Sequence, residues 1–232
     1  MLNLNYCENG LNTGLLSLKK DSPLARLKAQ PKTVSITGAF SKDREEVERF
    51  ITDIYAKSYN AEISVHYPIL MSVRDEAGKL LAATGFRPAQ SEPLFLEQYL
   101  DAPIEAVLNA PRSQIVEIGN LASQGGGASL FLFAALAAYL NDKNFTRAVV
   151  TSTDFLERRF KQMGLQPKRH TKADPSLLLS EGENWGSYYA TQPHVISGSV
   201  AHGYKRLERQ LGAHYTDCRP RLFPRLHYKD AY

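Results

Sequence analysis

A carboxylate and an amide side chain interrupt an apolar segment in the middle of the chain. Glu117 follows an Ile-Val pair, and Asn120 comes three residues later in Glu-Ile-Gly-Asn. A charge on an apolar strand is costly to bury unless it has a purpose, and a carboxylate can take a proton from a nucleophile. We therefore predict Glu117 as a general base and Asn120 as a residue that orients a carbonyl. The alternatives are a structural ion pair of Glu117 with Arg87 or Arg112, and a bulge or strand end at Asn120.

Three consecutive glycines follow this segment, in Ser123-Gln-Gly-Gly-Gly-Ala-Ser129. Glycine lets the backbone approach a ligand closely, and the first-turn amides of a following helix can donate to a phosphate. The loop lacks both the Gly-Lys-Ser/Thr of phosphate-loop NTPases and the Gly-x-Gly-x-x-Gly spacing of dinucleotide folds. The sequence therefore predicts a phosphate-binding turn of another kind, with a plain strand-to-helix turn as the alternative.

Further polar residues lie near the end of a predicted hairpin strand and in the segment that follows it. Arg87 can clamp a substrate carboxylate, or it can pair with Glu117 or Glu97. Glu97 and Tyr99 interrupt the apolar run that begins at Leu94. Two residues apart on a helix they lie on different faces, so we do not expect both to reach one site. Arg87, Glu97 and Tyr99 are all candidates for binding the substrate that accepts a transferred group. For Glu97 the alternative is a surface or capping position.

Aromatic residues cluster in Trp185-Gly-Ser-Tyr-Tyr189 and on an early helix. The hydroxyl of Tyr188 is a candidate proton donor, whereas packing in the core is the common role of such clusters. Tyr55 and Tyr59 are four residues apart on one helix face. We predict Tyr55 as part of an acceptor-pocket wall, with helix packing as the alternative.

Other kinds of site find little support in the sequence. Cys7 and Cys218 fit no metal-ligand spacing, the six histidines are scattered, and no Ser lies in a Gly-x-Ser-x-Gly elbow. We therefore predict no metal site, no disulfide framework and no serine hydrolase. Residues 202–232 carry seven Lys or Arg against three acidic residues, which equals the net charge of the chain, +4. Such a tail suits an acidic carrier protein or a peripheral membrane contact, although most are simply solvated; we predict no nucleic-acid partner.

The 232 residues are 43% hydrophobic and 22% charged, which is typical of a globular protein of one large domain. The longest apolar run is about 11 residues, short of the ~20 of a membrane-spanning helix. The first residues lack the pattern of a secretory signal, so we expect a cytoplasmic location.

The order of predicted elements is that of an α/β fold with a mixed central sheet flanked by helices. We predict a helix from Ser41, which caps it, a hairpin over 69–86, two short helices over 94–108, and a strand over 114–122 with a bulge at Gly119. A helix over 130–141, a strand over 147–152 and a helix capped by Asp154 follow. We expect residues 1–40 to form an N-terminal arm, 41–211 the domain, and 212–232 a basic tail.

The glycine loop resembles a known signature. Gln124-x-x-Gly127-x-Ser129 is similar to the Gln/Arg-x-x-Gly-x-Gly/Ala motif of the GCN5-related N-acetyltransferase (GNAT) superfamily, and departs from it at the last position. The resemblance implies that this loop binds the pantetheine phosphates of an acyl donor, whose thioester lies between two splayed strands. It also implies a tyrosine, here Tyr188, that protonates the leaving thiolate. The implied donor-binding residues are Gln124, Gly125, Gly126, Gly127, Ala128 and Ser129.

Longer segments resemble the thermostable hemolysin family, from about residue 41 to 205. They are Ala82-Ala-Thr-Gly-Phe-Arg-Pro-Ala89, Leu94-Phe-Leu-Glu-Gln-Tyr-Leu-Asp101, Pro103-Ile-Glu105, Glu117-Ile-Gly-Asn-Leu-Ala122 and Trp185-Gly-Ser-Tyr-Tyr189. Gly85-Phe-Arg87 with Glu117-x-x-Asn120 is also similar to the paired Arg and Glu-x-x-Arg of acyl-homoserine lactone synthases, with Asn in place of the second Arg. That replacement argues against a homoserine-lactone product.

Together these resemblances imply a GNAT-like acyltransferase with no permanently bound cofactor. Its co-substrate is acyl-CoA or an acyl-phosphopantetheine carrier protein, and its acceptor is the amine of a small molecule or amino acid. Two alternatives stay open. One is a hemolysin that acts on membranes, and the other is a non-catalytic ligand-binding module on the same fold.

Overall fold

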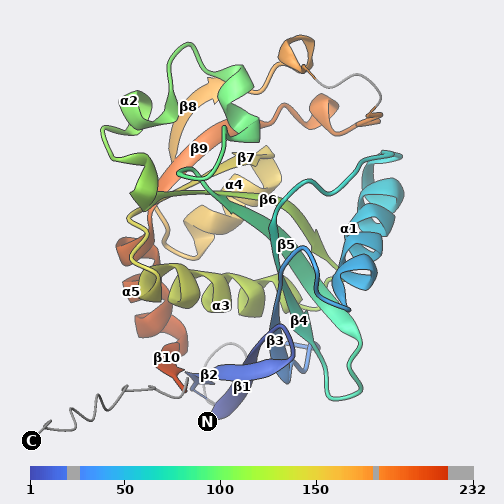
Figure 1. Ribbon diagram of the computed structural model, residues 1–232, viewed down its shortest axis with the longest axis vertical. Coiled ribbons are helices and arrows are strands. Elements are labelled where there is room, and N and C mark those ends of the chain that lie inside the picture. Colours follow the sequence, from blue (N-terminus) through green and yellow to red (C-terminus); the bar gives the residue numbers. More distant parts are fainter. Residues whose placement is uncertain (20–26, 180–182, 219–232) are drawn as a thin grey trace, which may run out of the picture.

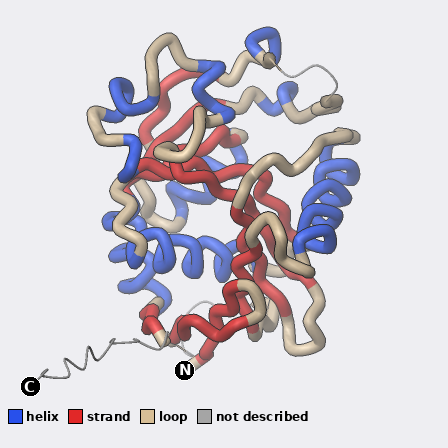
Figure 2. Tube along the Cα trace, in the orientation of Figure 1, coloured by secondary structure: helices blue, strands red, loops and turns tan. Residues whose placement is uncertain are grey.

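The computed structural model describes residues 1–19, 27–179 and 183–218. Their strands form one mixed sheet in the order β10-β2-β1-β3-β4-β5-β6-β7-β9-β8, which runs through the whole molecule (Figure 2). The strands are β1 (Leu2–Glu8), β2 (Leu11–Leu18), β3 (Thr33–Thr37), β4 (Ile69–Arg74), β5 (Leu80–Pro88), β6 (Ile115–Ser123), β7 (Arg147–Ser152), β8 (Lys168–Lys172), β9 (His194–Ser199) and β10 (His214–Asp217).

Helices cover both faces of this sheet, and Figure 1 shows α1 and α3 on opposite sides of β4 and β5. The α-helices are α1 (Arg44–Tyr59), α2 (Ile104–Leu108), α3 (Ala128–Asp142), α4 (Asp154–Gln162) and α5 (Val200–Leu211), and the 3-10 helices are η2 (Phe95–Tyr99), η3 (Arg112–Gln114), η4 (Pro175–Leu177) and η5 (Tyr189–Thr191). The predicted α/β class, a mixed sheet flanked by helices, is therefore confirmed.

Alternate residues of β4 and β5 contribute to two of the three hydrophobic clusters among the described residues. On one face, Val47, Ile51 and Tyr55 of α1 pack with Leu70 of β4 and Ala83 of β5. On the other face, the neighbouring positions of the same strands pack with α3. This alternation is what a strand buried on both faces requires. No helix among the described residues is long and apolar enough to cross a membrane.

Residues 1–40, expected to form an arm, instead contribute three strands to the sheet. β1 pairs with β2 as a hairpin and lies parallel to β3. The interpretation as an arm was wrong for these strands because Leu4, Tyr6, Leu16 and Leu18 alternate with polar residues, and all four are fully buried. In the predicted basic tail, 214–217 form β10 against β2, and residues 219–232 lie outside the described residues.

Two predicted helix caps differ from the structure. Helix α1 begins at Arg44 with Asp43 at its N-cap, and the Ser41 hydroxyl instead accepts a hydrogen bond from the Gly38 amide at 3.0 Å. Helix α4 is capped by Thr153, whose hydroxyl accepts from the Leu156 amide at 3.3 Å. Asp154 lies in the first turn of α4, where a negative charge interacts favourably with the helix dipole.

A bulge in β6 shapes the middle of the sheet. Ala83 is opposite Ala122 and Gly85 is opposite Gly119, so two residues of β6 lie opposite one residue of β5. The extra residue is accommodated by Asn120, whose φ of 49° is left-handed. The predicted bulge at Gly119 is thereby confirmed. It changes the direction in which the side chains on either side of it point.

Candidate active site

Strands β6 and β7 separate where the bulge begins. Their parallel pairing ends at Ile118 with Val150, although β6 continues to Ser123. A cavity of about 170 Å³ lies at this point and is lined by Gly119 and Asn120 of β6 and Thr151 of β7. Its other lining residues are Tyr55, Ser64, His66, Tyr67, Arg87, Phe95, Ile118, Glu183, Trp185, Tyr188 and Tyr189. The structure therefore has a hollow in the gap between two splayed strands.

Tyr67 forms the floor of this cavity across two glycines. A Cβ atom at Gly85 would lie 2.5 Å from the Tyr67 side chain, and one at Gly119 would lie 2.0 Å from its hydroxyl oxygen. Only glycine leaves room for the ring at both positions. Interaction with Tyr67 in turn lowers the pKa of Glu117. The bulge, the glycine pair and Tyr67 thus fix one another.

Aromatic rings form much of the cavity wall. Tyr55, Trp185, Tyr188 and Tyr189 lie with ring centroids 5.2 to 6.4 Å apart in the contacts that join them. The Tyr188 hydroxyl donates to the Thr151 carbonyl at 3.3 Å, and burial raises the pKa of Tyr188 well above its usual range. Burial also raises the pKa of Tyr55, and interaction with Asn120 acts in the opposite direction.

Two polar atoms of this wall are buried without a hydrogen-bond partner among the described residues. They are the indole nitrogen of Trp185 and the hydroxyl of Thr151, and both residues line the cavity. A buried polar group without a partner costs free energy. Both atoms are buried within the wall and are not exposed to the cavity.

A histidine and a carboxylate meet at the cavity lining. His66 Nε2 lies 3.0 Å from Glu183 Oε1, and the same oxygen accepts from the Ser64 amide at 3.1 Å. The side chain of His66 is 66% exposed and that of Glu183 is 12% exposed. Because the carboxylate only accepts hydrogen bonds, the proton of the neutral ring is on Nε2, and Nδ1 keeps its lone pair.

Arg87 is engaged by the walls of the cavity. Its Nη2 donates to the His66 carbonyl at 2.8 Å and its Nη1 to the Pro93 carbonyl at 3.3 Å. Its Nε lies 2.9 Å from Glu92 Oε1, and its guanidinium lies 5.2 Å from the centre of the Tyr67 ring. Arg87 therefore holds together the segments before β4 and after β5, and a role in binding an acceptor carboxylate stays a prediction.

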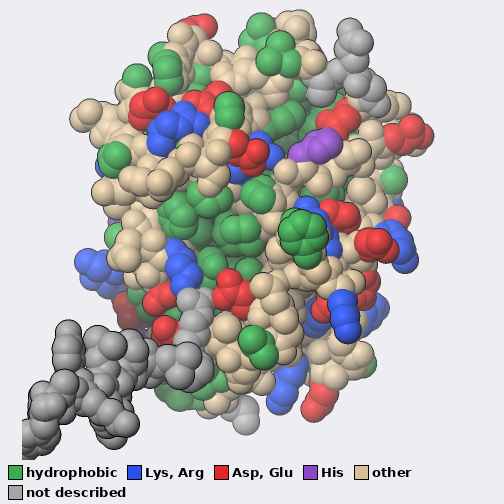
Figure 3. Space-filling view, viewed as in Figure 1, with side chains coloured by type: hydrophobic (Ala, Val, Ile, Leu, Met, Phe, Trp, Pro, Cys, Tyr) green, Lys and Arg blue, Asp and Glu red, His purple; other side chains and the backbone are tan. Residues whose placement is uncertain are grey.

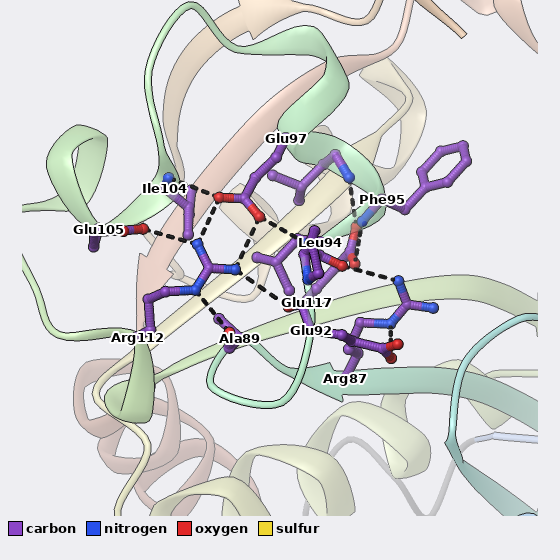
Figure 4. Close-up of polar contacts among 12 residues, drawn as sticks. Arg87, Ala89, Glu92, Leu94, Phe95, Glu97, Ile104, Glu105, Arg112 and Glu117 are labelled. Atoms are coloured by element: carbon purple, nitrogen blue, oxygen red, sulfur yellow. Dashed lines mark hydrogen bonds and ion pairs between the residues drawn. The ribbon is translucent and has the colours of Figure 1, made fainter. Parts of the chain in front are cut away.

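Glu117 is not among the residues that line the cavity, and its carboxylate holds η2 (Figure 4). It is 1% exposed, and its two carboxylate oxygens accept from the amides of Phe95 at 3.0 Å and Leu96 at 2.9 Å. Burial raises the pKa of Glu117 to about 7, although these amides, Arg87 and Tyr67 act in the opposite direction. Neither predicted ion pair forms. The role of general base stays a prediction.

Glu97 and Tyr99 lie away from the cavity on different sides of η2, as their spacing predicted. Arg112 bridges Glu97 and Glu105 with Nη1 at 2.7 and 2.8 Å (Figure 4). Burial alone would raise the pKa of Glu97, but hydrogen bonds from Arg112 and from the amides of Ile104 and Leu94 lower it to about 2. Glu97 lines a separate, open groove of about 630 Å³. The Tyr99 hydroxyl contacts that of Tyr189 at 2.5 Å.

The glycine loop lies between β6 and α3, and the segment 27–29 covers it. The Ala29 amide donates to the Gly126 carbonyl at 3.1 Å. A Cβ atom at Gly127 would lie 2.6 Å from the Leu27 side chain, whereas one at Gly126 would have only ordinary contacts with Lys28 and Ala29. All three glycines have left-handed φ values. The predicted loop is thus built as a tight glycine turn before a helix.

The structure brings four of the predicted residues to one cavity: Tyr55, Arg87, Asn120 and Tyr188. Sequence reasoning missed His66, Tyr67, Thr151 and Glu183 as lining residues. Tyr67 has a local signal, since Gly85 and Gly119 are small positions on neighbouring strands. His66 and Glu183 have none, because they are 117 residues apart in the chain. In the space-filling view, apolar side chains gather in the middle of the face shown, bordered by charged ones (Figure 3).

Solved structures with similar folds are acyltransferase-like synthases. The acyl-homoserine lactone synthase LasI is 14% identical, with a TM-score of 0.54, over 80% of this chain and 98% of that one. BjaI, described as a CoA-dependent acyl-homoserine lactone synthase with SAM and isopentyl-CoA, is 12% identical, with a TM-score of 0.55, over 77% and 89%. FeeM, an N-acyl amino acid synthase from uncultured soil microbes, is 12% identical, with a TM-score of 0.51, over 74% and 98%.

These likenesses show the fold, which is GNAT-like as expected. A search of curated protein sequences gave no match. The model of the family described as thermostable hemolysin matches residues 38–204. That match spans more than half of the chain and includes the cavity, the bulge and the glycine loop. The chain belongs to the thermostable hemolysin family.

Proposed function

We propose that this protein is an acyltransferase. It passes an acyl group from a pantetheine thioester, either acyl-CoA or an acylated carrier protein, to the amine of a small molecule or amino acid. The observation that carries the proposal is the cavity at the point where β6 and β7 separate, reached along β6 from the glycine loop.

The spacing along β6 supports a long, extended donor. Asn120 lines the cavity, and β6 continues for three residues to Ser123, about 10 Å of strand, before the glycine turn begins at Gly125. A ligand with its phosphate at the loop and its reacting carbon at the cavity therefore needs an extended arm between them, which a pantetheine thioester has. In this proposal residues 124–129 hold the phosphate.

The groups around the cavity suit attack on a thioester carbonyl. The bulge at Asn120 interrupts the ladder of β6, so backbone groups next to the cavity are available to a developing oxyanion. The Tyr188 hydroxyl is the candidate proton donor to the leaving thiolate, and it would give up its bond to the Thr151 carbonyl to act. Tyr55 and Asn120, which both line the cavity, orient the substrate.

The donor site is tested by Gly126→Asp, measured by calorimetric titration with CoA, with medium- and long-chain acyl-CoA and with acylated carrier protein. A carboxylate here repels the phosphate. A Cβ atom at Gly126 meets only ordinary contacts, so the fold tolerates it apart from a left-handed backbone. The matched control is Gly10→Asp, since Gly10 also has a left-handed φ, 83°, and open space around it.

We expect one thioester to bind the wild type at micromolar affinity, the Gly10 variant to bind equally, and the Gly126 variant to lose at least tenfold in affinity. Release of free thiol in the presence of amines then measures transfer. Binding without transfer to any amine would indicate a ligand-binding module. If no thioester binds and the protein partitions onto liposomes, the acyltransferase proposal is wrong. The glycine loop is then only a turn, and the result favours a direct action on membranes.

A further inference from the structure

The cavity contains a carboxylate–histidine pair that the sequence did not indicate. His66 and Glu183 both line it, beside the bulge residue Asn120. His66 lies in the segment just before β4. Glu183 lies in the segment that also carries the aromatic residues Trp185 and Tyr188. Two segments that are far apart in the sequence therefore bring an imidazole and a carboxylate together at the cavity.

We propose that His66 is the group that takes the proton of the acceptor amine, with Glu183 as the positioning residue that orients the ring. This inference rests on the proposed acyl transfer. An amine in water near neutral pH arrives as an ammonium ion and has no lone pair for attack. A nearby proton acceptor that contacts solvent is therefore needed before the carbon–nitrogen bond can form.

The geometry of the pair fits this role. Glu183 Oε1 is fixed by the Ser64 amide at 3.1 Å and lies 3.0 Å from His66 Nε2. This contact sets the tautomer and leaves Nδ1 to accept a proton. The backbone of His66 is fixed as well, because its carbonyl accepts from Arg87 at 2.8 Å. With 66% of its side chain exposed, His66 can pass the proton on to water.

Glu117, the base predicted from the sequence, lacks these properties. It is 1% exposed, and both oxygens already accept backbone amides. Taking a proton from a substrate would require it to give up at least one bond to η2. It also does not line the cavity, whereas His66 and Glu183 do.

The remaining cavity wall suits an ammonium ion. Tyr55, Trp185, Tyr188 and Tyr189 present aromatic rings, which attract cations over their faces, and Glu183 supplies a negative charge. The substrate class is thus a small primary amine.

The ammonium gives one proton to His66 Nδ1, and the neutral nitrogen attacks the thioester carbon. The carbon–sulfur bond breaks as the amide forms, and the second proton of the nitrogen ends on the leaving thiolate, giving free thiol. The imidazolium then releases its proton to solvent. No oxidant, reductant or metal enters the balance.

The test compares His66→Gln, Glu183→Gln and His66→Ala with His202→Gln, which replaces an exposed histidine of α5. Each variant is assayed for thiol release from the acyl-CoA that binds best, with the most active amine of a panel of amino acids and small primary amines. Donor affinity is measured by calorimetry in parallel.

We expect His66→Gln to lower kcat by about 10²-fold or more, the range of a lost general base, with unchanged donor affinity. Glu183→Gln lowers kcat by a smaller factor. Added imidazole restores part of the activity of His66→Ala, because the site is open to solvent, and restores none in Glu183→Gln. His202→Gln behaves as wild type.

Two outcomes separate the inference from the function on which it rests. If the wild type transfers acyl groups and His66→Gln transfers them at the same rate, His66 is not the proton acceptor, and a collapse in Glu117→Gln alone would assign that role to Glu117. If the wild type transfers to no amine of the panel, the proposed acyl transfer is overturned and the inference falls with it.

Discussion

Replacing Glu117 by Gln should change how the stability of the protein depends on pH. Burial raises the pKa of this carboxyl to about 7 in the folded chain, from an ordinary value of 4.5. The folded state therefore holds the proton more tightly than the unfolded state does. The Glu117 carboxyl therefore makes its full contribution to the free energy of unfolding below pH 4.5, and this contribution is lost as the pH rises through 7.

The size of the effect follows from the same two values. A difference of 2.5 pKa units corresponds to about 3 kcal/mol between the limits of low and high pH. Between pH 5 and pH 8 the linkage relation predicts that roughly 2–3 kcal/mol of this difference is lost. Gln cannot ionise, so the variant lacks this loss. The variant is instead destabilised by an amount that does not depend on pH. Its amide nitrogen cannot accept a hydrogen bond, so the amide of either Phe95 or Leu96 loses its acceptor.

Urea unfolding of wild type and Glu117→Gln at pH 5, 6, 7 and 8 measures the effect. The free energy of unfolding of the variant, relative to wild type, should rise by roughly 2–3 kcal/mol across this series. Met71→Leu, a volume-conserving change at a fully buried position without a titratable group, should give a flat difference. A flat difference for Glu117→Gln as well would refute the claim that burial of this carboxyl is linked to folding.

Two further changes test the supports of the site. Arg112→Met should lower the free energy of unfolding by roughly 1–3 kcal/mol at pH 7 and by less at pH 3. The pKa of Glu97 is held at about 2, so its contribution fades as the pH falls from 4.5 towards 2; equal losses at both pH values in urea unfolding would contradict this. Gly119→Ala should cost about 1–3 kcal/mol, because its Cβ would lie 2.0 Å from the Tyr67 hydroxyl. In thermal unfolding the loss should be smaller in a Tyr67→Ala background, and simple additivity would show that the two residues do not touch.

Most elements of the fold could be predicted from local patterns. The hairpin of β4 and β5, the strand β6 and the helices α1, α3 and α4 follow from periodicity and from the turn residues between them. The β1–β2 hairpin was missed, although Asn9 and Gly10 form its turn with left-handed φ values. The caps were misplaced by one or two residues because Ser41, Asp43, Thr153 and Asp154 are all acceptable cap residues.

The candidate site was only partly predictable, for a physical reason. Asn120 and the glycine loop lie on one strand and its turn, so their sequence order already brings them together. Arg87 and Glu117 are neighbours across β5 and β6, yet their side chains bond to different backbone segments. Which partner a buried charge takes depends on the loops packed over it, and no local pattern encodes that.

The structural unit is larger than the region that defines the family. The family match ends at 204 and begins at 38, whereas β1, β2, β3 and β10 form one side of the sheet beyond β4. Removing them would expose the edge of β4 and the apolar residues that pack on α3. The segment 27–29 also bonds to the glycine loop. The N-terminal strands therefore belong to the same folded body as the site, and the segment between β2 and β3 packs on the glycine loop.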